Sequence, residues 1–226
     1  MRSTAAARIM ACNPLLVRNL CAQSPAINGK QEVVRDFSCN FRAGVCYRLI
    51  GSDHAEKSLL LQLLGLQVMP DSGEVEVDGI PVSNLSFDDL SDLRNRKFGF
   101  LFSAPFLLPA FTVLENVAMP LFKIAQVAAP EAKIITEEIM NFVGVAHLAD
   151  RSIAELSALE QVQTALARAL VHHPRIFIAE NLGSKLSLEA TERLLVTIRQ
   201  AAQRLGVAAI FTTSSLIAQH PTDVCI

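Results

Sequence analysis

One short segment constrains the fold of this chain more than any other: the run GSDHAEKS at residues 51–58. It follows VCYRLI at 45–50, whose alternating and then apolar pattern is typical of a buried strand. It leads into KSLLLQLLG at 57–65, whose apolar content is that of a helix. The segment therefore predicts a strand, a loop and a helix in succession, the unit from which α/β domains are built.

The same segment matches most of a phosphate-binding loop. Such a loop has the pattern G-x-x-x-x-G-K-[ST] between a strand and a helix, so that backbone amides and the helix N-terminus surround the phosphates. Gly51, Lys57 and Ser58 are in place, whereas the second glycine is Glu56. Two interpretations of Lys57 and Ser58 are equally open: a phosphate site, or an ordinary pair of residues in the first helical turn.

Strands and helices alternate along the rest of the chain. Residues 74–79 alternate polar and apolar side chains after a turn-rich PDSG, which predicts an edge hairpin. FGFLF at 98–102 predicts a short strand, and 132–143 has the apolar spacing of an amphipathic helix. The apolar runs at 175–179 and 207–212 predict parallel strands that are covered on both faces. The order of elements favours an α/β domain.

Composition agrees with one large domain. The chain has 226 residues, of which 51% are hydrophobic, so residues 1–226 are predicted to form a single domain with a helical sub-lobe at about 112–156. The net charge of -2 gives no general attraction to nucleic acid, which is not expected as a partner. The five cysteines lack a C-x-x-C pair, so neither a zinc site nor a disulfide framework is predicted. No metal site and no membrane span are expected.

Over nearly its whole length the chain resembles the ATP-binding-cassette (ABC) ATPase family. PDSGEVEVDG at 70–79 is similar to the hairpin after the family's first helix, and FTVLENVAMPL at 111–121 to the segment after its glutamine loop. ELSALEQVQTALARALVHHPRIFIAEN at 155–181 is similar to the signature helix and the Walker B strand. The branch that it resembles is that of lipoprotein-releasing, macrolide-export and cell-division subunits.

The resemblance implies an architecture and a set of partners. The expected fold is that of a P-loop NTPase-like ABC ATPase: a mostly parallel sheet flanked by helices, with an antiparallel β edge and a helical sub-lobe. The ligand of such a domain is Mg-ATP. The expected partners are a membrane permease subunit and a second nucleotide-binding domain, as a homodimer or a heterodimer. The expected location is cytoplasmic, peripheral at the inner face of the cell membrane through the partner.

The phosphate loop departs from the family at two glycine positions, which are His54 and Glu56 here. A carboxylate at position 56 would lie beside the β-phosphate, and two like charges about 4 Å apart repel by about 1 kcal/mol in water and by more in a less polar site. Glycine also adopts backbone angles that a residue with a Cβ resists. Both changes oppose phosphate binding.

The signature motif, LSGGQ in the family, is LSALE here. Ser157 is retained, but Ala158 and Leu159 replace the two glycines, and the leucine side chain would occupy the approach to the partner's phosphate. Ser157 with Glu160 three residues later also has the pattern of a helix N-cap with a capping box. We predict that this ordinary cap is their role.

The remaining functional positions have changed too. The resemblance places Ser24 at the adenine-stacking aromatic residue and Ser103 at the glutamine that senses magnesium and the membrane subunit. Walker B ends in Glu180-Asn181 instead of Asp-Glu, and an asparagine has no carboxylate with which to act as a general base. The switch histidine is Ser214. The positions that would be catalytic are thus occupied by Asn181 and Ser214.

Several aromatic and histidine side chains have alternative interpretations. Phe100, Phe102, Phe106 and Phe111 are candidates to line a groove for a permease helix, although core packing is predicted for the first two. The adjacent histidines at 172–173 lie on different helix faces, so a helix C-terminal cap is expected rather than a joint metal site.

The changes together predict a catalytically degenerate ABC nucleotide-binding-domain subunit with a structural or regulatory role. Phosphoryl transfer depends on positioning and electrostatics, so one retained lysine does not compensate for losses at several positions. In a homodimer both sites would be inactive, and in a heterodimer the LSALE motif would face the working site. Two alternatives are a working transporter ATPase with altered motifs and a soluble scaffold without a permease.

Overall fold

The computed structural model describes residues 13–23, 33–51, 54–213 and 223–225. Its strands are β1 Leu15–Gln23, β2 Val33–Phe41, β3 Cys46–Arg48, β4 Ser72–Val77, β5 Ile80–Pro81, β6 Phe98–Leu101, β7 Ile176–Leu182, β8 Ala208–Thr213 and β9 Asp223–Cys225. Its α-helices are α2 His54–Leu64, α3 Phe87–Lys97, α4 Val113–Pro120, α5 Ala129–Val143, α6 Ala158–Leu170 and α7 Leu188–Leu205. Shorter helical turns are η1 Val82–Asn84, η2 Leu121–Ala125, η3 Ala146–Leu148 and η4 Ile153–Glu155.

A five-stranded sheet in the order β6-β7-β8-β3-β9 forms the centre of the molecule, and all of its strand pairs are parallel. The predicted strands at 98–102, 175–179 and 207–212 are confirmed as β6, β7 and β8. Successive residues of β7 enter opposite cores: Phe177 packs with one cluster of buried side chains and Ile178 with the other. The apolar runs of β6, β7 and β8 lack polar alternation because both faces of the sheet are covered.

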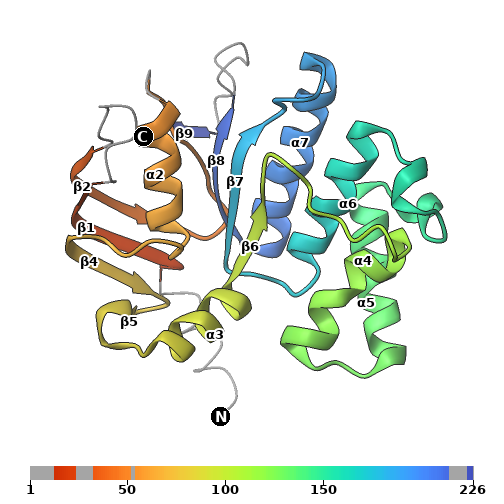
Figure 1. Ribbon diagram of the computed structural model, residues 1–226, viewed down its shortest axis with the longest axis horizontal. Helices are drawn as coiled ribbons and strands as arrows, with labels where there is room; N and C mark the ends of the chain where they lie inside the picture. The colour runs from red at the N-terminus through yellow and green to blue at the C-terminus, as the bar shows by residue number, and fades with distance from the viewer. Residues whose placement is uncertain (1–12, 24–32, 52–53, 214–222, 226) are drawn as a thin grey trace.

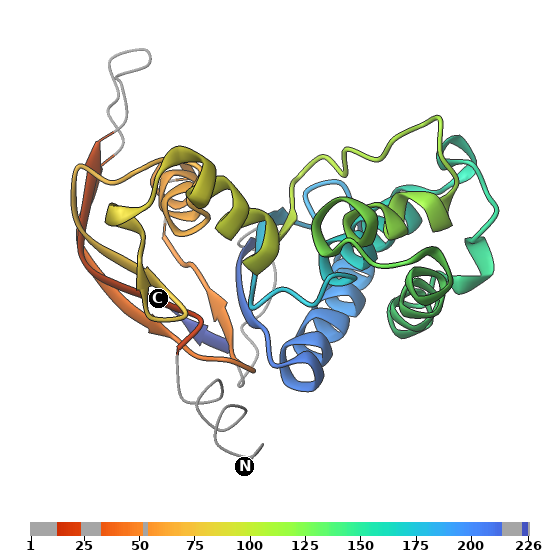
Figure 2. The same cartoon turned by 90° about the horizontal axis from the view of Figure 1, so that it is seen from below.

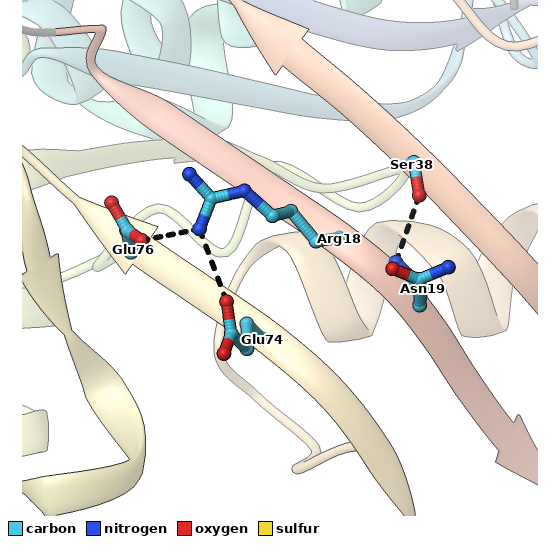
Figure 3. Close-up of polar contacts among 5 residues, drawn as sticks. All are labelled: Arg18, Asn19, Ser38, Glu74 and Glu76. Atoms are coloured by element: carbon cyan, nitrogen blue, oxygen red, sulfur yellow. Dashed lines mark hydrogen bonds and ion pairs between the residues drawn. The ribbon is translucent and has the colours of Figure 1, made fainter.

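The antiparallel strands form a second sheet, in the order β2-β1-β4-β5. The predicted edge hairpin is confirmed as β4 and β5, which are joined by Asp78 and Gly79 at φ 49° and 78°. Both residues are therefore left-handed, as the tight turns that match the twist of a hairpin require. On the solvent face of this sheet, Arg18 of β1 pairs with Glu74 and Glu76 of β4 at 3.0 and 2.8 Å (Figure 3).

Helix α2 lies between the two sheets, whereas α6 and α7 cover the other face of the parallel sheet (Figure 1). Helices α4 and α5 pack on α6, away from the antiparallel sheet (Figure 2). The helix predicted at 132–143 is confirmed as α5, with Glu137 and Glu138 exposed. Within the described ranges no helix combines the length and the apolar character needed to cross a membrane.

One carboxylate joins the two sheets. Asp78 of the β4–β5 turn contacts Lys97 Nζ at 2.7 Å, at the end of α3, and Arg175 Nε at 3.1 Å, just before β7. The Asp78 side chain is 19% exposed, so solvent screens these contacts less than it screens surface pairs. The hairpin is thereby fixed to the start of the parallel sheet.

The histidines at the end of α6 correct one expectation. The His172 side chain does not cap its helix: its Nε2 lies 3.1 Å from the carbonyl oxygen of Phe98 on β6. Its Nδ1 is buried and has no hydrogen-bond partner among the described residues, and burial lowers the pKa of the ring. A backbone hydrogen bond closes the end of α6 instead: the His173 amide donates to the carbonyl oxygen of Leu170.

Candidate functional site

Helix α2 begins inside the segment that resembles a phosphate loop. The sequence predicts a helix from Lys57, but α2 begins at His54. In an α-helix each amide donates to the carbonyl four residues earlier, so the Ser58 amide is directed to the carbonyl of His54. Glu56 lies in the first turn, where a negative charge stabilises the helix by about 0.3–1 kcal/mol. The helix therefore begins three residues earlier than the sequence predicts, and the amides of its first turn, at residues 54–57, have no carbonyl within the helix to bond.

The lysine of the motif contacts its own loop. Lys57 Nζ donates a hydrogen bond of 2.8 Å to the carbonyl oxygen of Gly51. In a working loop this ammonium reaches the β- and γ-phosphates. Here the Lys57 ammonium and the Gly51 carbonyl satisfy one another, and Glu56, one residue away, is exposed.

Ser58 and Glu180 are brought together although they lie far apart in the sequence. The Ser58 hydroxyl donates a hydrogen bond of 2.5 Å to Glu180 Oε1, which joins the first turns of α2 to the end of β7. A serine hydroxyl and an acidic side chain at these positions are magnesium-binding groups in P-loop proteins. The pair therefore fits Mg²⁺ by chemistry, but its two groups bond directly to each other.

The backbone after Glu180 leaves the extended conformation. Asn181 has φ 50°, in the left-handed region that asparagine tolerates better than most residues. Its amide donates to Thr212 Oγ1 of β8 at 2.8 Å, where the register between β7 and β8 shifts. Asn181 thus has a local structural role, and its side chain offers no titratable group to an attacking water.

Ser103 faces the end of β7 across a small cavity of about 100 Å³. The cavity is also lined by Ala158 of α6, by Glu180 and by Asn181. Ser103 itself is exposed. The structure therefore gathers three of the predicted positions with the first residue of the signature helix, while Lys57 lies outside this cavity.

The signature residues form the predicted capping box. Ser157 is the N-cap of α6: its hydroxyl accepts from the Glu160 amide at 3.3 Å, and its own amide donates to Glu160 Oε2 at 2.7 Å. Hydrogen bonds from the Ser157 hydroxyl and amide lower the pKa of the Glu160 carboxyl. Ala158 is exposed and Leu159 is half-buried on the first turn. The N-cap prediction is confirmed.

Other predicted positions lie outside the described residues. These are Ser24 at the adenine position and Ser214 at the switch position. Of His54 only the backbone, in α2, is described. Among the described residues no group of three or more His, Cys, Asp or Glu side chains is arranged to hold a metal ion.

Sequence patterns did not reveal an apolar cavity of about 410 Å³ on the helical side of the molecule. Its walls come from α4, η2 and α5, and they consist of Phe111, Leu114, Glu115, Ala118, Met119, Phe122, Lys123, Ala129, Lys133 and Thr136. The lining is apolar, with two lysines and one glutamate. Of these residues, the sequence predicted only Phe111 to line a groove. The cavity forms where α4 and α5 meet, and the apolar pattern of either helix does not predict how they meet.

The phenylalanines of β6 and of the segment that follows it form a row of ring contacts from the core to the surface. The ring centroids of Phe98, Phe100, Phe102 and Phe106 follow one another at 5.9, 5.7 and 5.9 Å. Phe98 is buried, Phe102 is 39% exposed and Phe106 is 68% exposed. Core packing therefore accounts for Phe100, which packs against the core, whereas for Phe102 the prediction is wrong.

The fold and the site together define an ABC-type ATP-binding domain. The family model for ABC transporters matches residues 34–181 of the chain. The chain is 35% identical over 185 residues to the lipoprotein-releasing system ATP-binding protein LolD of Bacteroides thetaiotaomicron, a match that covers 82% of this chain and 84% of that protein. The chain therefore belongs to the ABC transporter family.

Solved structures have the same fold. The dimeric structure of MJ0796, a bacterial ABC transporter cassette, is 24% identical with a TM-score of 0.77 and covers 89% of this chain and 88% of its own. The cbiO1 protein of Clostridium perfringens, part of the ABC transporter complex cbiONQ, is 21% identical with a TM-score of 0.78 and covers 89% and 78%. At these identities the likeness concerns the fold alone.

Proposed function

We propose that this chain is a catalytically degenerate nucleotide-binding-domain subunit with a structural or regulatory role in an ABC-transporter-type membrane complex, and that it hydrolyses little or no ATP. The observation that carries the proposal is Glu56, an exposed carboxylate in the first turn of α2, at the helix N-terminus where the phosphates would bind. Two negative charges at that place repel each other, so the carboxylate opposes phosphate binding. The vestigial site comprises Gly51, His54, Glu56, Lys57, Ser58, Ser103 and Glu180, with Ser157, Ala158, Leu159 and Glu160 as the signature.

The polar groups of the site support the same proposal. Lys57 bonds to Gly51, and Ser58 bonds to Glu180, so a nucleotide and its magnesium would have to break both hydrogen bonds. Glu56 adds a negative charge at the helix N-terminus, where the phosphate would bring another. Asn181 supplies no general base. Entry of a nucleotide and hydrolysis are therefore both disfavoured.

The membrane partner is proposed from the apolar cavity. A volume of about 410 Å³ with an apolar lining fits side chains of a short helix from another subunit, and Lys123 and Lys133 at its wall suit an acidic residue on that helix. The LolD relative belongs to a lipoprotein-releasing system, which makes a membrane-embedded subunit the occupant that we propose. Through it, residues 1–226 would act as a single domain at the cytoplasmic face of the membrane.

Titration calorimetry with Mg-ATP tests the degenerate site. We expect no binding below 1 mM, about -4 kcal/mol, for the natural chain. The double variant His54→Gly and Glu56→Gly removes the first-turn charge and adds two helix-breaking residues at about 1 kcal/mol each, so it is expected to gain binding. Glu56→Gln is the matched control, because it removes the charge and leaves the helix.

The outcomes separate the competing functions. Sub-millimolar binding by the natural chain, together with turnover that Lys57→Ala abolishes, would establish the working ATPase instead. The specific observation in its favour is that Lys57 and Ser58 are both present. Failure of the double glycine variant to bind would show that the helical turn is held by more than residues 54 and 56.

A further inference from the structure

The segment that joins β6 to α4 passes over α6 (Figure 1), and several of its apolar side chains are exposed. Phe102, Phe106, Leu108 and Phe111 are 39%, 68%, 38% and 40% exposed. Such a chain without helix or strand hydrogen bonds needs other partners for its backbone groups. Side chains of the two helices beside it supply several of these partners, and the Phe111 amide donates to the carbonyl of Leu108 within the segment.

Arg168 of α6 holds the middle of this segment. Its Nη2 donates to the carbonyl oxygen of Pro105 at 2.6 Å, and its Nη1 donates to that of Phe106 at 2.9 Å. Two donors of one planar guanidinium thus bind two consecutive carbonyls, an arrangement that a lysine cannot reproduce. Burial lowers the pKa of Arg168, and no carboxylate of the described residues pairs with it. Its guanidinium therefore interacts with the carbonyls of the loop rather than with an acidic side chain.

The conformation of Phe106 needs such support. Its φ of 46° is left-handed, which costs free energy for a residue with a bulky side chain. With this backbone the ring meets Phe102 edge to face and still leaves most of its surface exposed. A loop free to relax would abandon the left-handed angle and move the ring.

The far end of the segment is fixed by Asn116 of α4, which is fully buried. Its Oδ1 accepts from the Leu108 amide at 2.8 Å, and its Nδ2 donates to the carbonyls of Leu108, Phe111 and Thr112 at 3.1, 3.2 and 2.9 Å. Because Asn116 fixes this end, the part of the segment whose conformation depends on Arg168 is the one around Pro105 and Phe106.

We propose that Arg168 is a positioning residue: it fixes the backbone at Pro105 and Phe106 to α6 and so holds the Phe106 ring outward in one orientation. The use of that ring by a partner rests on the proposed function, but the positioning itself does not. The signature residue Ser157 caps the N-terminus of α6, so a displacement of the signature that moves this helix also moves Phe106.

A tryptophan probe tests the proposal, because the chain contains no tryptophan. In Phe106→Trp, time-resolved anisotropy should show little fast depolarisation, and adding Arg168→Met should raise the fast amplitude about twofold. Arg168→Lys, which retains one donor group and the charge, should fall between. The control is Phe87→Trp on α3, 82% exposed, whose anisotropy should not respond to Arg168→Met.

Amide hydrogen exchange on the full chain supplies the second measurement. With Arg168→Met, exchange should accelerate within 103–110 while the amides of β7 and β8 keep their protection. A fast amplitude of the Phe106→Trp probe that neither Arg168 variant changes would overturn the proposal, as would an equal rise in the Phe87→Trp control. If Arg168→Met does not fold, Arg168→Lys decides. No nucleotide or partner is present, so the result is independent of the calorimetric test of function.

Discussion

Ser58 and Glu180 are 122 positions apart, and the 2.5 Å hydrogen bond between them joins the helix after the phosphate loop to the end of the central strand β7. In P-loop proteins a hydroxyl and a carboxylate at these positions bind a magnesium ion. Here the Ser58 hydroxyl donates to the Glu180 carboxylate, and this hydrogen bond holds α2 against the parallel sheet.

Removing this hydrogen bond should destabilise the protein by the same amount with and without magnesium in solution. We expect Ser58→Ala and Glu180→Gln each to lower the free energy of unfolding by about 1–2 kcal/mol, because a hydrogen bond to a partly buried charged group is lost. In a double-mutant cycle the two effects should not add. Urea unfolding with and without Mg²⁺ measures this, and exposed Ser184→Ala is the control. A stabilisation by millimolar Mg²⁺ alone would contradict it.

The capping box of α6 should contribute stability that depends on the Glu160 charge. Ser157→Ala is expected to cost about 1 kcal/mol, as at other N-caps. Since the folded-state pKa of Glu160 is lowered, its contribution is present above the ordinary value of 4.5 and is lost as pH falls through the folded value. Thermal unfolding between pH 6 and pH 3 measures this.

The control for that experiment is Glu160→Gln, which should flatten the part of the pH profile that Glu160 supplies. Glu155, which caps η4 in the same way with Ser152, also has a lowered pKa and should keep its share in this variant. A pH profile that Glu160→Gln does not alter would show that the charge is immaterial to the cap.

His172 should make the protein less stable as the solution becomes mildly acidic. Burial lowers the pKa of its ring in the folded state, so the unfolded chain takes up the proton first as pH falls below the ordinary value of 6.5. Stability is full above this value and declines below it. His172→Gln should reduce the slope of stability between pH 7 and pH 5, whereas exposed His173→Gln should not. Chemical denaturation at each pH provides the measurement.

Gly99 on β6 should tolerate no side chain. A Cβ at this position would overlap the carbonyl oxygen of Ala169 on α6, where the helix lies closest to the strand. We expect Gly99→Ala to cost about 2–3 kcal/mol and to lower Tm by about 5–10 °C. Gly51→Ala is the comparison, since its Cβ would meet only the Lys57 side chain at 3.8 Å. Equal melting temperatures of the two variants would contradict the close packing.

Much of the fold was predictable because its signals are local. The uninterrupted apolar run of β7 and the Asp78-Gly79 turn each depend on a few adjacent residues, and Ser157 with Glu160 needs only a spacing of three. The start of α2 at His54 differs from the prediction because the phosphate-loop motif places a loop before Lys57. Its signal was present: Glu56 favours the first turn of a helix, and the glycines that would open a loop are absent.

The parts of the site that depend on tertiary contacts were not predictable. The hydrogen bond between Ser58 and Glu180 joins residues far apart in the sequence, so no local pattern shows that they lie close together in the fold. Arg168 shows no pattern that links it to Pro105, since an arginine on a helix most often faces solvent. The apolar cavity depends on how α4 and α5 meet, which the amphipathic pattern of either helix leaves undetermined.

The helical first turn of α2 sets the cost of placing glycine in it. Glycine is a poor helix former, so His54→Gly or Glu56→Gly alone should destabilise this turn by up to about 1 kcal/mol. Under the proposed function no bound nucleotide offsets that loss, so each single change to glycine is expected to lower the free energy of unfolding.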